Sequence, residues 1–194
     1  TKFTATESAE AFNYMAMAGW KPQQMIDGIS GIMSLAAASG EDLGTTSDIV
    51  TDALTAFGLQ AGDAGHFADV LAQASANANT NVSMLGESFK YVAPVAGAMN
   101  YSVEDTSLAL GLMANASIKG SMAGTALKTS LANMAAPTDS MAAAMDKYGI
   151  SLTDSEGNMK SLRGVIDNLR GSLGGLSETE QTAAASTIFG KEAM

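Results

Sequence analysis

The chain has 194 residues, which is enough to bury a core in one large domain or two small ones. Its formal net charge is −10, from 20 acidic and 10 basic residues, and the basic residues are scattered, so binding to the backbone of DNA or RNA is not expected. The sequence contains no cysteine, which excludes disulfides, thiolate metal sites and cysteine nucleophiles.

The hydrophobic composition indicates a mainly α fold. Hydrophobic residues make up 46% of the chain but aromatic residues only 6%, and 13 residues are methionine. Alanine, leucine and methionine favour helices, whereas strands prefer aromatic and β-branched residues. No stretch of about 20 predominantly apolar residues occurs, so no membrane-spanning helix is predicted. Residues 1–12 lack the basic start and apolar run of a signal peptide.

Hydrophobic periodicity and capping signals predict a string of short helices. In the first half of the chain they cover residues 7–18, 22–39, 45–57, 63–76 and 83–92. Pro22 suits the first turn of its helix, and Gly40 and Gly58 suit the left-handed position after a helix end. Pro94 is expected to break or kink the chain after the fifth helix.

The predicted helices of the second half cover residues 103–116, 121–134, 138–148, 161–173 and 177–189. Two of them begin with capping-box spacing, SVED at 102–105 and SETE at 177–180. Between the third and fourth of these helices, apolar and polar residues alternate around the turn sequence DSEGN. This pattern predicts one small β-hairpin near 150–161, with strands near 150–153 and 158–161.

Together these elements predict a mainly α, compact and irregular multi-helix domain with that one hairpin. No segment of the sequence repeats visibly at a fixed period of about 20–50 residues, so a solenoid is not expected. Glycine and proline interruptions exclude a long coiled coil. The chain is interpreted as a single helical domain over residues 1–194, or as two packed helical subdomains with a boundary near 94–102.

The stretch ANASIKGSMAGTALKTSL, residues 114–131, holds the most suggestive glycines. Only three residues separate Gly120 from Gly124 and no lysine follows at once, so the spacing excludes a phosphate-binding loop. Flanking lysines exclude a membrane-helix seam. We therefore assign Gly120 to a corner with positive φ and Gly124 to close helix packing. The glycines assigned to corners or close packing are Gly40, Gly58, Gly120, Gly124, Gly149 and Gly157.

Side chains suited to catalysis or metal binding are sparse. His66 is the only histidine, and it is expected on the first turn of its helix, facing water, rather than as a ligand or general base. DSEGN resembles half a calcium loop, but Arg163 stands where an EF-hand places its bidentate glutamate, so a simple turn is favoured. We predict no catalytic residue, cofactor or metal.

The methionines allow two interpretations. Seven of them fall on apolar helix faces, which favours core filling, and the alternative is a surface that repacks against changing partners. These seven are Met15, Met25, Met33, Met84, Met113, Met122 and Met134. Leu108 and Leu112 are assigned to the apolar face of their helix in the same way.

Seven motifs follow one another along nearly the whole chain, from about residue 10 to the end. They are AGW, GISGIMSLAAASGEDL, TSDIVTDALTAFGL, FADVLAQASANANTNVSMLGESFKYVAPVAGAM, YSVEDTSLALGLMANASIKGSMAGTALKTSL, GISLTDSEGNMKSL and TIFGKEAM. In this order they resemble the core region of phage tail tape-measure proteins. One departure is Ser117, which stands where the family pattern has a glycine.

The resemblance implies a structural and scaffolding role without enzymatic activity. Tape-measure proteins extend through the tail tube, set the number of stacked tube rings and take part in genome delivery. The resemblance implies contacts with the tube protein, the tail assembly chaperone and baseplate or distal tail components, and self-association. It implies a location in the virion tail lumen, and in the host cytoplasm during assembly.

A chain of 194 residues is too short to act as the ruler. We interpret it as a domain excised from a longer phage or prophage polypeptide. Two hypotheses stay open. In the first, the chain is a scaffold whose acidity repels DNA and helps it leave the tail ahead of the genome. In the alternative, its amphipathic helices form an envelope-active module that inserts into the host membrane during infection.

Overall fold

The computed structural model describes residues 2–190. Over these residues the chain forms ten α-helices, one short 3-10 helix and no strand, so the mainly α prediction is confirmed. In chain order the elements are α1 (Ala5–Met17), α2 (Pro22–Ser39), α3 (Leu43–Phe57), η1 (Ala61–Asp63), α4 (Ala64–Asn77), α5 (Val82–Ala98), α6 (Val103–Asn115), α7 (Gly120–Ala135), α8 (Asp139–Tyr148), α9 (Leu162–Leu173) and α10 (Glu178–Phe189).

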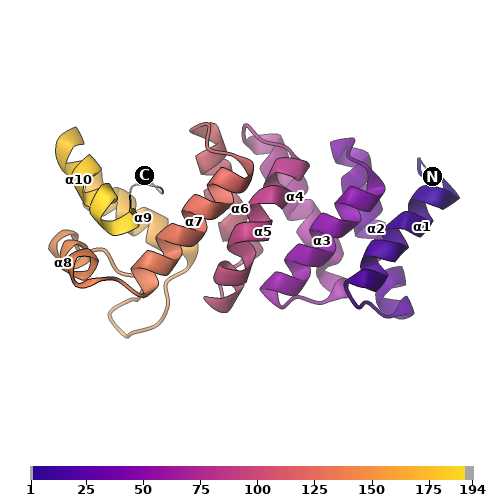
Figure 1. Cartoon of the computed structure of the whole chain (residues 1–194), viewed down its shortest axis with the longest axis horizontal. Coiled ribbons are helices and arrows are strands. Elements are labelled where there is room, and N and C mark those ends of the chain that lie inside the picture. Colours follow the sequence, from indigo (N-terminus) through magenta and orange to yellow (C-terminus); the bar gives the residue numbers. More distant parts are fainter. Residues whose placement is uncertain (1, 191–194) are drawn as a thin grey trace.

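The helices stack side by side along the long axis of the molecule in two layers (Figure 1). In one layer α1, α3, α5 and α7 each contact the next, and in the other α2 contacts α4, α4 contacts α6 and α6 contacts α9. Stacked helix pairs of this kind form an α-solenoid, in which each unit contacts mainly its neighbours. The solvent-accessible surface of 9677 Å² exceeds the roughly 8,600 Å² expected of a compact protein of 19.7 kDa, as an elongated shape requires.

The prediction that no repeat exists is therefore wrong. The four helices of the first layer begin at residues 5, 43, 82 and 120, so successive starts are 38, 39 and 38 residues apart. The repeat is hard to see in the sequence because it is carried by helix spacing. Only α5 and α7 share a recognisable pattern, S-M-x-G-x-x-x-K, at 83–90 and 121–128.

Small residues allow neighbouring helices of a layer to approach closely. A Cβ atom added to Gly31 of α2 would lie 2.6 Å from the Cα of Gly65 in α4, and one added to Gly86 of α5 would lie 2.6 Å from the side chain of Ile49 in α3. Side-chain hydroxyls complete the contacts of the first layer. Ser47 of α3 donates a hydrogen bond to the carbonyl of Ala11 in α1, at 3.0 Å.

Five of the helices, α1, α3, α5, α6 and α8, end in the same reversal, the Schellman motif. In α3 the N–H of Leu59 bonds back to the carbonyl of Leu54 at 2.8 Å, and Gly58 between them has a φ of +70°. The residues that take the left-handed position in the five motifs are Gly19, Gly58, Asn100, Ser117 and Gly149. An apolar or aromatic residue follows each one and packs back on the fold: Trp20, Leu59, Tyr101, Ile118 and Ile150.

Two predicted features of the chain are wrong, a break of the chain at Pro94 and the β-hairpin. Helix α5 continues through Pro94 to Ala98. Proline removes the hydrogen bond to the carbonyl of Lys90, but Lys90 and Pro94 are both exposed, so water can satisfy that carbonyl. The β-hairpin is also absent from the described residues. A single antiparallel bridge joins Thr153 to Met159. No third strand extends the ladder, and an isolated hairpin is marginal in water.

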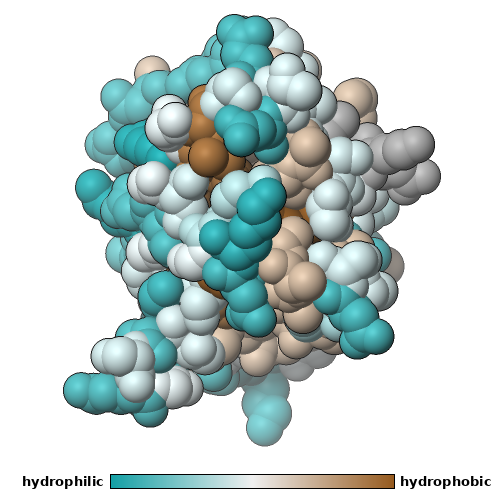
Figure 2. All heavy atoms as spheres, turned by 90° about the vertical axis from the view of Figure 1, so that its left-hand side faces the viewer, coloured by the Kyte–Doolittle hydropathy of each residue, from teal (hydrophilic) through white to brown (hydrophobic). Residues whose placement is uncertain are grey.

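One continuous cluster of buried residues extends from Ala11 to Ile188 and lies mainly between the two layers. Its centre holds Phe89, whose ring meets those of Phe67 and Phe57 edge to face at centroid distances of 5.6 and 5.8 Å. The end formed by α8 and α10 faces the viewer in Figure 2, where hydrophilic side chains cover most of the surface and hydrophobic ones form small patches. Among residues 2–190, no helix has the length and apolar character needed to cross a bilayer.

Candidate functional site: a groove between α4 and α6

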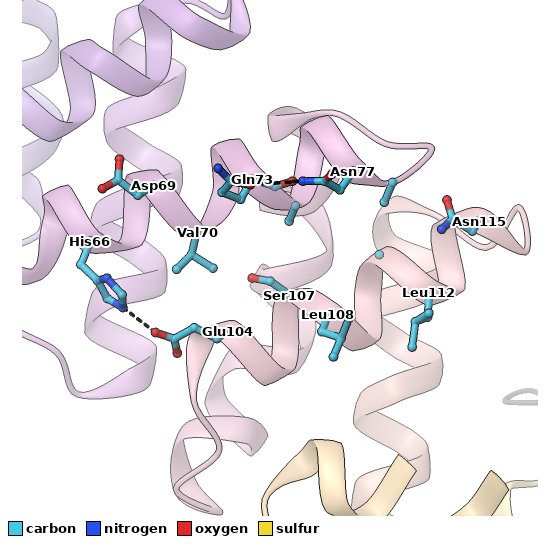
Figure 3. Close-up of a pocket in the computed structure, with 13 residues that line it drawn as sticks. His66, Asp69, Val70, Gln73, Asn77, Glu104, Ser107, Leu108, Leu112 and Asn115 are labelled. Carbon is cyan, nitrogen blue, oxygen red and sulfur yellow. Dashed lines mark hydrogen bonds and ion pairs between the residues drawn. The ribbon is translucent and has the colours of Figure 1, made fainter. Parts of the chain in front are cut away.

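A groove of roughly 480 Å³ lies between α4 and α6 in the second layer (Figure 3). Its apolar lining comes from Val70 and Ala74 on α4 and from Leu108 and Leu112 on α6. The groove follows α4 from His66 to Ala78, which is about 18 Å at 1.5 Å per residue. It is therefore as long as three helical turns.

The groove exists because α4 and α6 are less closely packed than α4 and α2. Gly31 and Gly65 bring the backbones of α2 and α4 together, whereas on the α6 side a Cβ added to Gly111 would reach only the Cβ of Ala78, at 3.3 Å. Leu108 and Leu112, which the sequence places on the apolar face of their helix, are each 41% exposed. The buried side of α6 carries small and polar residues together with Val103 and Leu110.

A polar contact lies near each end of the groove, one between α4 and α6 and one between α6 and the connection that follows α4. At one end Nε2 of His66 contacts a carboxylate oxygen of Glu104. At the other end the backbone N–H of Asn79 donates to Oδ1 of Asn115 at 2.8 Å. As predicted, His66 lies on the first turn of α4 with an exposed side chain, but its contact with Glu104, 38 residues away, could not be predicted from the sequence.

The environment of Glu104 favours its charged form. Partial burial acts to raise the pKa of the Glu104 carboxyl, but hydrogen bonds from the backbone and from His66 outweigh it, and the pKa lies below its ordinary value. Asp69 lies on the same rim, and within the described part of the chain no lysine or arginine lines the groove. The rim is therefore acidic.

Ser107 is the one buried polar side chain in the groove. It is 2% exposed, and its hydroxyl has no hydrogen-bond partner. Figure 3 shows the hydroxyl pointing from α6 toward the space between the two helices. A buried polar group without a partner is costly, and few occur in native proteins.

The described residues offer little for catalysis or metal binding. No group of three or more histidine, aspartate or glutamate side chains is placed to hold a metal ion between residues 2 and 190. In the loop around DSEGN, Asp154 accepts hydrogen bonds from the backbone N–H groups of Asn158 and Glu156, both at 2.9 Å. These bonds, that of Asn158 first, hold the pKa of Asp154 below its usual range, and they give the carboxylate a structural role.

The six glycines singled out from the sequence lie apart from this groove. Gly40, Gly58, Gly120, Gly149 and Gly157 have φ angles between +58° and +87°. Gly124 lies directly against the backbone carbonyl of Ser88 in α5. All six occupy turns or helix contacts of the scaffold.

The methionines divide between core and surface. Met15 and Met134 are buried, but Met84 is 40% and Met122 69% exposed, so core filling does not explain these two. They occupy equivalent positions in α5 and α7, 38 residues apart.

A two-layer helical array of this kind presents an extended surface to its surroundings. A family model described as phage-related minor tail protein matches residues 1–190. The chain therefore belongs to the family of phage-related minor tail proteins. The family match spans the first six motifs on which the resemblance was based and the first four residues of the last, TIFGKEAM, which ends outside the described residues.

Two curated relatives match the whole length of this chain. The chain is 41% identical over 194 residues to the tape measure protein of Pneumococcus phage Dp-1, and covers 17% of that protein. It is 27% identical over 195 aligned positions to the probable tape measure protein of Escherichia phage P2, and covers 24% of it. No solved structure matches the chain.

Proposed function

We propose that this chain is a structural domain of a tail tape-measure protein. The observation that carries the proposal is the match of the entire chain, at 41% identity, to part of a protein named for that role. The α-solenoid supports it, because such arrays present extended surfaces for binding other proteins. The chain spans about a fifth of the relatives, so the domain works within a longer polypeptide in this proposal.

In this role the domain takes part in tail assembly, length determination and genome delivery. Its partners are the tube protein, the assembly chaperone, baseplate or distal tail components and further copies of itself. It resides in the tail lumen of the virion, and in the host cytoplasm while tails assemble. The net charge of −10 keeps the domain from holding the genome that shares the tube.

An in-frame deletion tests the role in the full-length protein. Removal of the segment equivalent to residues 1–190 from the phage gene is expected to abolish tails or to change their length, as seen by electron microscopy of lysates. The control is a second in-frame deletion that removes the same number of residues from another part of the protein. It shows the effect of shortening the protein alone. Tails of normal length and infectivity after the first deletion would contradict the proposal.

The charge argument has its own test. Duplex DNA is expected to show no binding to the purified chain at about 150 mM salt. Measurable binding would refute the idea that acidity keeps the domain off the genome.

A further inference from the structure

We propose that the groove between α4 and α6 is a docking site for one amphipathic helix of another protein, with aliphatic residues on one face and lysine or arginine beside them. The inference is independent of the tape-measure role, because it depends only on the residues of the groove. Four observations lead to it: the exposed leucines, the helical walls, the acidic rim and the unpartnered hydroxyl of Ser107.

The apolar floor calls for a hydrophobic occupant. Leu108 and Leu112 are one helical turn apart on α6, and both are 41% exposed although they stand next to Val70 and Ala74 of α4. When an apolar side chain enters the groove, these leucines lose contact with water. That burial stabilises the bound state by about 25 cal/mol per Å² of apolar surface. Scattered surface leucines are common, but a lined groove marks a binding site.

The backbone of the groove selects a helix over an extended strand. Both walls are α-helices, whose N–H and C=O groups are already bonded within each helix. An extended segment would leave its own backbone N–H and C=O groups without hydrogen-bond partners over the apolar floor. Each unpaired group would cost binding free energy. A helix satisfies its backbone internally and brings residues at i, i+3, i+4 and i+7 to one face. The groove length of about 18 Å matches three turns of such a helix.

The rim determines the charge of the occupant. Asp69 and Glu104 stand on it, His66 contacts Glu104, and no lysine or arginine among residues 2–190 lines the groove. The chain as a whole carries a net charge of −10. A second copy of this chain or an anionic membrane would bring further negative charge to an acidic rim, whereas a helix with basic flanks is complementary to it.

Ser107 offers a polar contact that would fix the position of the bound helix along the groove. Its hydroxyl is buried and unpartnered, and it points into the space between α4 and α6 (Figure 3). A polar side chain on the apolar face of the occupant would pair with it. Because a buried unpaired group is costly, that pairing contributes more than a hydrogen bond on the surface.

The test uses a fluorescein-labelled helical peptide of about 18 residues, alanine-based, with leucines at i, i+3, i+4 and i+7, one serine on that face and flanking lysines. A second peptide carries glutamates in place of the lysines. Fluorescence anisotropy with the whole chain is expected to give a Kd below about 50 µM for the lysine peptide, and at least tenfold weaker binding for the glutamate peptide. The lysine peptide should also bind more weakly as salt rises.

Variants of the chain locate the site. The double variant Leu108→Asp, Leu112→Asp is expected to weaken binding of the lysine peptide at least tenfold, and Ser107→Ala severalfold. Met122→Asp is the matched control, because Met122 is an exposed apolar residue of α7 outside the groove and its loss should leave binding unchanged. Unchanged helical circular dichroism of each variant shows that it is folded.

Three results would overturn the proposal. One is no binding of the lysine peptide, or equal binding of both peptides. The second is binding of the lysine peptide that survives the double leucine variant. The third is that vesicles of phosphatidylglycerol and phosphatidylcholine, or a second copy of the chain detected by light scattering, bind through Leu108 and Leu112 in place of the peptide.

Discussion

The repeat region, residues 5–135, and the C-terminal region, residues 136–190, hold their helices together by different means. In the repeat region the helices of each layer meet at glycines and serines, so that backbone lies against backbone, as at Gly31 and at Gly124. In the C-terminal region side-chain amides bridge the elements. Asn168 of α9 donates to the carbonyl of Gly149 at 3.0 Å and accepts from the N–H of Ser151 at 3.0 Å.

The difference shows how one chain can combine a regular array with an irregular end. Close packing at small residues depends only on how the surfaces of two helices fit together. It can therefore recur wherever small residues recur at the same positions in successive helices. Amide bridges depend on particular pairs, such as Asn133 with the carbonyl of Phe189, and they suit a region where no helix repeats the position of an earlier one. The predictions below test whether this contrast is energetic as well as geometric.

The largest effect is expected at Gly124. Replacement of Gly124 with Ala places a methyl group against the backbone carbonyl of Ser88, which cannot move aside as a side chain can. The free energy of unfolding, measured by urea denaturation, is expected to fall by about 3 kcal/mol or more. Gly171→Ala is the matched control in α9, where an added Cβ meets nothing within 4 Å. It should be neutral or stabilising by up to about 1 kcal/mol. Equal changes in the free energy of unfolding for Gly124→Ala and Gly171→Ala would contradict the proposed difference between the two regions.

A smaller, local effect is expected at Asn168. Asn168→Ala leaves the carbonyl of Gly149 and the N–H of Ser151 without their amide partner, which should cost about 1–2 kcal/mol. Hydrogen exchange should increase in residues 149–160 while the amides of α3 and α5 keep their protection. Gln23→Ala, which removes a surface amide bonded to Asp27, is the control and should change stability by less than about 0.5 kcal/mol. Global loss of protection in Asn168→Ala would show that the two regions are not energetically distinct.

The smallest effect is expected at Ser117, which joins α6 to α7. Its φ of +70° disfavours any residue with a Cβ atom. Ser117→Gly should therefore raise the free energy of unfolding by about 1 kcal/mol, seen as a higher Tm. Ser121→Gly, on the exposed first turn of α7, should instead lower it by about 0.5–1 kcal/mol. A lower Tm for Ser117→Gly would mean that its hydroxyl contributes more than the backbone strain costs.

The positions of the helices could be predicted because their ends are marked locally. Gly58 and Gly149 end α3 and α8 with positive φ, and the SETE sequence forms a reciprocal capping box in which Ser177 and Glu180 exchange hydrogen bonds. The resemblance to tape-measure proteins also implies a glycine in place of Ser117, and the structure has a left-handed residue there. These signals act within a few residues, so the sequence alone contains them.

The layers and the groove could not be predicted, because they depend on which helices meet. Leu108 and Leu112 form an apolar stripe of α6 that is indistinguishable in sequence from a buried one. Only the packing shows that α6 buries Leu110 and leaves Leu108 and Leu112 at the surface. Similarly, Pro94 stops most helices, and it is tolerated in α5 because the carbonyl it frees faces water.

The 38 to 39 residue spacing has a mechanical consequence. Units joined in series by contacts between neighbours all bear the same end-to-end load, so the weakest interface yields first. A folded unit advances the array by about 10 Å, the distance between packed helices. The same 38 residues, fully extended, would span about 125 Å. A unit that unfolds under tension therefore becomes roughly twelve times as long without breaking a covalent bond.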